Sequence, residues 1–241
     1  MVSPVSRTAA SLPVPEGAGP DEVASKSART RQAIIDAALR VFREKGFDDA
    51  TMRAIAAEAG VSVGNAYYYF ASKEHLIQGF YDHAQEEHAR AAVPVLCSTT
   101  DLEGRIVGVL GAWIDVMEPY RAFGGKFFKN AAEPTSPLSP FSTESGPARS
   151  AAIALWAEVV TGSDVKIAKY LRDELPELLW LYAMGTVLFW VHDSTDGAAR
   201  TRILVKRTAP IVVRAIGLAR IPGLRATVMD LVALIAEIKT L

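Results

Sequence analysis

The stretch from Thr51 to Phe70, TMRAIAAEAGVSVGNAYYYF, constrains the fold of this chain more than any other segment. It indicates two short helices, because Thr51 and Ser62 each supply a hydroxyl that can cap the residues that follow. Gly60 lies between the two segments, where a glycine ends the first helix and permits a tight turn. A short turn that contains glycine is typical of the helix-turn-helix motif. The stretch therefore predicts two closely crossing helices, 52–59 and 63–69.

Helices are also predicted on both sides of this motif. Before it, residues 29–45 place apolar side chains at positions i, i+3, i+4 and i+7, and Gly46 follows as a stop signal. After it, Ser72 is expected to cap a fourth helix that runs to about Ala91, ahead of Pro94. The length of this fourth helix suits a connector between the motif and the rest of the chain.

The rest of the chain is helical by pattern, since no segment alternates with a period of two. Prolines and serines cluster in residues 133–147, which we expect to form a loop. Farther along the chain, Asp173 is expected to cap the helix predicted at 174–191. The helices predicted here are 102–117, 120–132, 148–160, 165–171, 174–191, 198–216 and 222–241. The predicted fold is all-α: a disordered tail (1–28), an N-terminal three-helix helix-turn-helix DNA-binding domain (29–75), and a C-terminal helical bundle for ligand binding and dimerisation (76–241).

Composition and charge exclude several classes of protein. The formal net charge is −1, so a basic coat for nucleic acid is absent and any DNA-binding face must be local. The single cysteine, Cys97, excludes an intramolecular disulfide and a multi-cysteine zinc site. The apolar run 178–191 is shorter than the roughly 18–20 residues of a membrane-spanning helix. Because residues 1–28 also lack the apolar run of a signal peptide, we expect a cytoplasmic protein without a membrane partner.

A helix-turn-helix presents the first residues of its second helix to base edges in the major groove. Here these residues are Val63, Gly64 and Asn65. The Asn65 amide is suited to adenine, and Val63 can pack on a thymine methyl group. Hydroxyl and basic side chains nearby are expected to contact phosphates: Arg29, Arg31, Thr51, Arg53, Tyr67, Tyr68 and Lys73. The tyrosines could instead be core residues, but consecutive side chains on a helix lie about 100° apart, so at least one hydroxyl must face outward.

Residues 31–80 resemble the N-terminal domain of the TetR/AcrR family of bacterial transcriptional regulators. The resemblance rests on Arg31-xx-Ile34-Ile35-Asp36-Ala37-Ala38, Phe42-xxx-Gly46-Phe47, Thr51-Met52-Arg53-xx-Ala56-xxx-Gly60-Val61-Ser62, Gly64-xx-Tyr67-Tyr68-Tyr69-Phe70 and Ser72-Lys73-Glu74-x-Leu76. It implies DNA contacts from Thr51, Arg53, Val63, Asn65, Tyr67, Tyr68 and Lys73, with repression as the default activity. It also implies a homodimer with a ligand-responsive C-terminal domain. The family often has Lys, Thr and His where Val63, Asn65 and Tyr68 stand, so no operator sequence is carried over.

The last predicted helix carries an apolar stripe with spacings of four, three, four and three residues: Leu224, Val228, Leu231, Ile235 and Ile238. Such a stripe is typical of paired helices. It favours a four-helix dimer bundle built with the preceding helix or with 174–191, the alternative being that it packs on its own chain. A homodimer would set two reading helices about 34–36 Å apart, so we expect a palindromic double-stranded DNA operator.

All four tryptophans lie in the predicted bundle, together with other large aromatic side chains. Most are expected in the core, but so many rings also favour a deep apolar pocket for a small apolar ligand. The apolar candidates for its lining are Trp113, Met117, Phe127, Trp156, Trp180, Met184 and Trp190. The candidate polar anchors are Arg121, Tyr182 and His192, although His192 could instead stabilise the end of its helix.

An enzyme is disfavoured, because the sequence has no nucleophile elbow, no glycine-rich phosphate loop and no HExxH motif. His75, His83 and His88 share one helical region and are expected to form a solvated polar face rather than a metal site. No cofactor and no metal are expected. The alternative function left open is a DNA-binding regulator without a small-molecule ligand, acting constitutively or through a protein partner.

Overall fold

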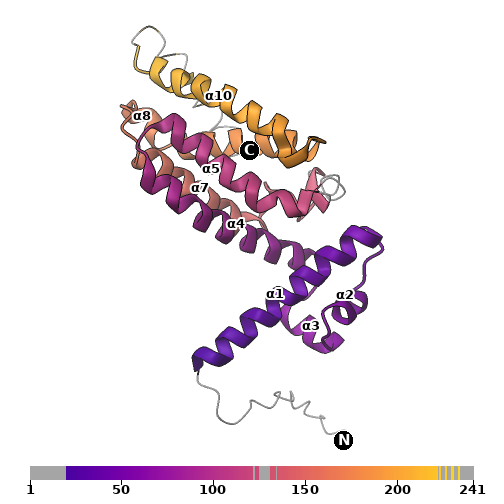
Figure 1. Ribbon diagram of the computed structural model, residues 1–241. Helices are drawn as coiled ribbons and strands as arrows, with labels where there is room; N and C mark the ends of the chain where they lie inside the picture. Colours follow the sequence, from indigo (N-terminus) through magenta and orange to yellow (C-terminus); the bar gives the residue numbers. More distant parts are fainter. Residues whose placement is uncertain are drawn as a thin grey trace, which may run out of the picture.

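The computed structural model describes residues 20–121, 123–124, 131–133, 135–221, 223, 226, 229–230 and 233, with side chains from residue 26 onward. Every regular element in these ranges is helical, which confirms the predicted all-α fold. The helices α1, α2 and α3 lie together at one end, and α5, α7, α9 and α10 pack at the other (Figure 1). The predicted stripe of Leu224, Val228, Leu231, Ile235 and Ile238 lies outside the described residues, as does Phe127.

The N-terminal unit consists of α1 (Pro20–Lys45), α2 (Met52–Glu58), α3 (Val63–Tyr69) and the first turns of α4 (Lys73–Ser98). Its core contains the almost fully buried side chains Ile35, Phe42 and Ile55. Ala56 of α2 and Ala66 of α3 are also buried, and these small side chains allow the two helices to approach closely. The two predicted short helices are thereby confirmed.

The first helix starts earlier than predicted. It begins at Pro20 rather than Arg29, so residues 20–28 are helical and do not belong to a disordered tail. The prolines and glycines of residues 1–28, which disfavour a helix, all lie at or before Pro20. Proline is tolerated at the first helical position because its missing N–H would have no partner there. The segment that follows contains Ala, Glu, Lys and Arg, which favour helix.

The fourth helix is longer than predicted, because α4 continues through Pro94 to Ser98. A proline inside a helix removes one hydrogen bond, which argued for an end near Ala91. Tertiary packing outweighs this cost: α4 lies along α5 (Leu102–Met117) and α7 (Gly146–Thr161) (Figure 1). Val95, one residue after the proline, packs against Gly108 of α5 where a Cβ atom would clash. The close contact keeps the last turn of α4 in place.

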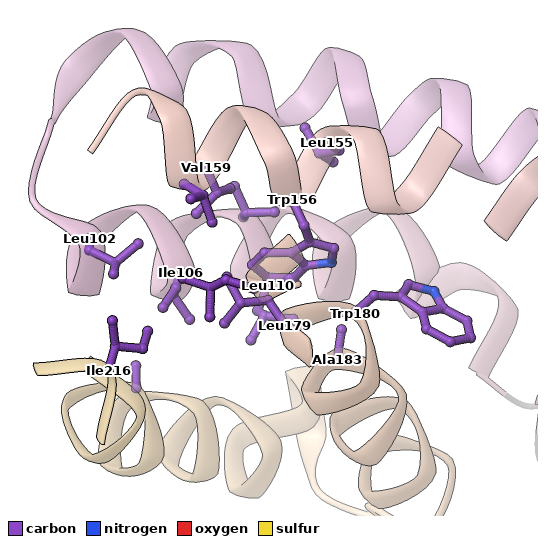
Figure 2. Close-up of a cluster of buried hydrophobic side chains, with 14 of the residues drawn as sticks. Leu102, Ile106, Leu110, Leu155, Trp156, Val159, Leu179, Trp180, Ala183 and Ile216 are labelled. Carbon is purple, nitrogen blue, oxygen red and sulfur yellow. The ribbon is translucent and has the colours of Figure 1, made fainter. Parts of the chain in front are cut away.

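The C-terminal bundle surrounds Trp156 of α7. Figure 2 shows its indole among side chains of α5, such as Ile106 and Leu110, and of α9 (Leu175–Val191), such as Leu179. The other side of the same core is closed by Ile216 of α10 (Ala199–Leu218). Trp156 is 2% exposed, so burial of this large ring contributes strongly to the bundle.

A buried arginine of α5 bonds the C-terminal ends of α4 and α7. Arg105 of α5 donates from Nη1 to the carbonyl oxygens of Leu96 and Thr99, each at 2.8 Å. It also donates from Nε to Val159 at 3.0 Å and from Nη2 to Glu158 at 2.8 Å. These carbonyls lie at the C-terminal ends of α4 and α7, where helices leave acceptors unsatisfied. Nothing in the residue pattern predicted this role.

Several helix ends differ from the predictions by a few residues. Asp173 does not cap α9; Glu174 occupies the N-cap position without a side-chain capping hydrogen bond, and Pro176 lies in the first turn. The short α8 comprises only Lys169–Arg172, and α7 begins at Gly146. A 3-10 turn, η1 (Glu118–Tyr120), follows α5, and another, η2 (Asp196–Ala198), precedes α10. No described helix is both long enough and apolar enough to cross a membrane.

Candidate functional site

Side-chain caps position the two short helices. The Thr51 hydroxyl accepts a hydrogen bond from the Ala54 N–H at 3.2 Å, and the Ser62 hydroxyl accepts one from the Asn65 N–H at 3.1 Å. Between the helices Gly60 has a φ of +67°, a conformation that favours glycine. The predicted caps and turn are therefore confirmed, and they fix the direction in which α3 begins.

The outer face of α3 carries the residues predicted to contact DNA. Tyr68 is 75% exposed, Tyr67 52% and Val63 38%, while Gly64 is exposed and Asn65 is half-buried. The opposite face of α3 is buried through Ala66. Tyr69 faces α1 instead, where its hydroxyl lies 3.2 Å from the Ser27 hydroxyl. The outer surface of α3 thus offers two exposed phenolic hydroxyls, one half-buried amide and one small aliphatic group.

The basic residues divide into two groups. Arg29 and Arg53 are exposed, as is Thr51. Arg31 is half-buried, with its guanidinium 5.1 Å from the centre of the Phe70 ring. Lys73 donates from Nζ to the carbonyl oxygens of Phe47 and Asp48, at 2.7 and 3.0 Å, and lies 4.8 Å from the Phe47 ring centre. Arg31 and Lys73 therefore stabilise the domain itself.

A cavity of about 500 Å³ lies between α4, α5, α7 and α9. Of the ten residues predicted for a ligand pocket, five line it: Trp113, Met117, Trp180, Met184 and Trp190. The volume is within the range of ligand sites, roughly 300–1,000 Å³. The cavity is also lined by residues that were not predicted from the sequence, among them Phe80, Tyr81, Tyr120, Phe123, Phe141 and Arg149.

Four other predicted pocket residues have different partners. Trp156 is enclosed by the core of the bundle, and Tyr182 hydrogen-bonds through its hydroxyl to Thr208 of α10. Tyr182 is two residues from both Trp180 and Met184, which turns its side chain about 200° away from theirs. His192 is exposed at the C-terminal end of α9, the alternative position considered for it. Arg121 donates to the carbonyl oxygens of Asp193 and Thr195, at 3.0 and 2.7 Å.

Asp193 organises the turn between α9 and α10. Its carboxylate accepts bonds from the N–H and hydroxyl of Thr195, at 2.9 and 2.6 Å, and from those of Thr201, at 2.8 and 2.7 Å. Burial by itself would raise the pKa of Asp193, but these four bonds outweigh it and hold the pKa well below its usual range. The carboxylate therefore stays ionised and holds the first turn of α10.

His88 differs from the expected solvated face, because it is 5% exposed and its Nε2 lies 3.0 Å from the Val109 carbonyl oxygen. Burial lowers the pKa of His88, although the bond to Val109 opposes the shift, so the imidazole is held neutral between α4 and α5. The described residues contain no cluster of His, Cys, Asp or Glu that could hold a metal ion.

The cavity and the N-terminal core share aromatic side chains. Phe123 lines the cavity and also stacks on Phe42 of α1, with ring centroids 6.1 Å apart. Phe80 of α4 lines the cavity as well and meets Phe123 edge-on at 6.1 Å and Tyr120 at 5.0 Å. The core beneath the helix-turn-helix therefore continues without a gap to the cavity wall.

Two family profiles match the chain. Residues 34–79 match the profile described as bacterial regulatory proteins of the tetR family. Residues 105–234, more than half of the chain, match the tetracyclin repressor-like C-terminal domain. The first match contains the helix-turn-helix, and the second contains most of the bundle that encloses the cavity.

Curated relatives match over part of the chain. The transcriptional regulator SrpR of Pseudomonas putida is 36% identical over 91 residues, which are 38% of this chain and 43% of SrpR. TtgW of Pseudomonas putida, an uncharacterised regulator, is 36% identical over 91 residues, or 68% of its length. UidR of Escherichia coli is 39% identical over 66 residues, 34% of its length. The chain thus spans less than half of SrpR and UidR.

Solved structures share the fold over most of the chain. A TetR transcriptional regulator from Nitrosomonas europaea aligns with a TM-score of 0.59 at 20% identity, covering 76% of this chain and 97% of that one. The fatty acid degradation regulator FadR of Bacillus halodurans aligns with a TM-score of 0.59 at 17% identity, covering 80% and 96%. FadR of Bacillus subtilis, solved with stearoyl-CoA, aligns with a TM-score of 0.58 at 15% identity, covering 74% and 96%.

Proposed function

Since this chain belongs to the TetR family of bacterial transcriptional regulators, we propose that it is a homodimeric repressor that leaves its DNA operator when a small apolar molecule fills the cavity. It acts in the cytoplasm, where its operator is found. The observation that carries the proposal is the sharing of Phe80 and Phe123 between the cavity wall and the core beneath the helix-turn-helix.

The outer face of α3 reads the operator. Asn65 reads a base edge and Val63 packs on a thymine methyl group, because both stand at the exposed start of the helix. Gly64 allows the backbone to approach the groove. Thr51, Arg53, Tyr67 and Tyr68 hold phosphates, with Arg29 reaching the backbone beside them. Arg31 and Lys73 support these contacts from within the domain.

A second copy of the chain covers the outer face of α10. Ile203, Ile211 and Leu218 are 60%, 54% and 46% exposed, and their spacing places them along one side of the helix. Phe189 of α9 adds an exposed ring. Pairing of these faces forms the four-helix dimer bundle and sets two α3 helices against one palindromic operator.

The ligand acts by binding one packing arrangement better than another. A molecule between Trp113, Trp190 and Phe123 displaces aromatic rings that also support α1 and α4. Packed cores respond to such displacement by switching arrangement, since they have little free volume. A coupling of about 1–3 kcal/mol changes operator affinity roughly 5–150-fold. The stearoyl-CoA bound by the Bacillus subtilis neighbour also carries a long apolar chain.

The test begins with the full-length chain and a pool of random duplexes, from which bound sequences are selected and sequenced. We expect a palindromic site whose binding weakens steeply with salt. A panel of apolar compounds is then added to the complex while fluorescence anisotropy reports the bound fraction. Release by at least one compound that also quenches tryptophan fluorescence supports the proposal. Operator binding that no cavity-binding compound alters would exclude ligand control.

A further inference from the structure

One cation faces the cavity. Among the described residues that line it, Arg149 of α7 is the only charged side chain, and no aspartate or glutamate lines it. Glu118, which follows the lining residue Met117, is paired with Arg121 at 3.0 Å. A positively charged ligand would therefore meet a like charge and no counter-ion, whereas an anion would meet an arginine.

Arg149 is already held in place. Its Nη1 donates to the carbonyl oxygens of Pro140 and Ser142, at 2.8 and 3.0 Å. Both of these bonds use one nitrogen, so the donors on Nε and Nη2 keep their capacity for a ligand. A guanidinium whose orientation is fixed in advance loses less entropy when it binds a carboxylate.

The rim and the interior of the cavity differ in polarity. The loop that Arg149 holds contains Phe141, which is 62% exposed and packs edge-on against Trp180 at 5.4 Å. Arg149 therefore lies beside the open side of the cavity. The interior is apolar, with Trp190 1% exposed and Trp113 at 5.1 Å from it in an edge-to-face contact. A ligand that fits has a charged end at the rim and an apolar body inside.

We propose that the ligand is a single-chain amphiphile with an anionic head, a long-chain carboxylate, whose carboxylate pairs with Arg149 while its chain lies between Trp113, Trp180 and Trp190. The inference deepens the proposed function, on which it rests. Charge-assisted bonds between a guanidinium and a carboxylate are about twice as strong as neutral ones and select anions over neutral molecules of the same length.

Three probes of equal chain length test the proposal: dodecanoate, dodecanol and dodecylamine, each below its micelle concentration. Binding to the full-length chain is measured by tryptophan quenching and by titration calorimetry. We expect dodecanoate to bind about tenfold or more tightly than dodecanol, and dodecylamine to bind most weakly. Equal binding of all three, or tightest binding of the amine, would overturn this proposal. The proposed control by an apolar ligand in the cavity would still stand. If no probe binds, the proposed ligand control fails with it.

Arg149→Gln separates recognition from support of the loop. We expect it to lose the preference for dodecanoate while dodecanol binds as before, and Arg149→Lys to keep part of the preference. Equal weakening of both probes would mean that Arg149 only holds the loop, which contradicts the proposal. Arg90→Gln, on the exposed side of α4, is the matched control for loss of one positive charge and should leave both affinities unchanged.

Discussion

Phe42 of α1 and Phe123 stack with ring centroids 6.1 Å apart and planes inclined by 23°. Phe42 belongs to the core that supports the helix-turn-helix, and Phe123 lines the cavity. The contact joins the two functional parts of the molecule through one pair of rings. Any ligand that moves Phe123 changes the surface against which α1 packs.

Phe123→Leu tests this contact. Leucine keeps the site apolar but removes the flat surface that rests on Phe42, so we expect the effect of a releasing compound on operator affinity to shrink by about fivefold. Anisotropy titrations with and without the compound measure the ratio of the two operator affinities. Phe141→Leu is the control, because Phe141 lines the cavity but packs on Trp180. An unchanged ratio in Phe123→Leu would show that ligand binding and operator binding are coupled through other residues.

Asn65→Ala tests base reading at the start of α3. Loss of one good base contact costs about 1–3 kcal/mol of discrimination, so the variant should bind the selected operator roughly 5–150-fold more weakly and lose preference at one position of each half-site. Binding to random DNA should not change. Selected-oligonucleotide sequencing gives the comparison. Tyr67→Phe is the matched control, expected to weaken all sequences to the same extent.

Lys73→Met tests a structural role for a side chain first predicted to contact phosphate. Because its ammonium bonds two backbone carbonyls after α1, we expect a loss of about 1–3 kcal/mol in unfolding free energy. The salt slope of operator binding should stay close to that of the wild type. Arg53→Gln should do the reverse, lowering the salt slope by about 1 without a loss of stability. If the salt slope of Lys73→Met were instead lower than that of the wild type, Lys73 would contact a phosphate, as first predicted.

Asp193→Asn tests the turn before α10. The variant loses charge-assisted bonds, so unfolding in urea at pH 7 should require about 2–4 kcal/mol less free energy. A carboxylate with a depressed folded pKa contributes stability above its unfolded value, 3.8, and loses it as the pH falls toward the folded value. The difference between wild type and variant should therefore be constant above about pH 5 and shrink below about pH 4. Asp196→Asn, at an exposed neighbour, should show no such difference.

Ile211→Glu tests the dimer. A carboxylate in the middle of the exposed face of α10 would be buried without a partner in the paired bundle, so the variant should sediment as a monomer. It should then bind a palindrome no better than a single half-site. Ala154→Glu, at an exposed position of α7, should remain a dimer. A dimeric Ile211→Glu would place the interface on another face.

Local signals accounted for the helix-turn-helix. Caps at Thr51 and Ser62 and the glycine at position 60 act within a few residues, so the two short helices could be predicted closely. The end of α4 could not be predicted this way. Pro94 is tolerated because Val95 packs on a glycine thirteen residues later, Gly108, and only the folded chain brings these residues together.

The sequence by itself determined the helical class, the helix-turn-helix and the placement of all four tryptophans after that motif, because each of these depends on residue type and short spacing. Only the tertiary structure decided which rings face a cavity. Trp156 and Trp180 have the same chemistry, yet one fills the core and the other lines the cavity. Likewise, only the structure shows that Lys73 and Arg31 lie against the rings of Phe47 and Phe70. The direction of a side chain depends on which helices pack against its own, and that information is distributed over the whole chain.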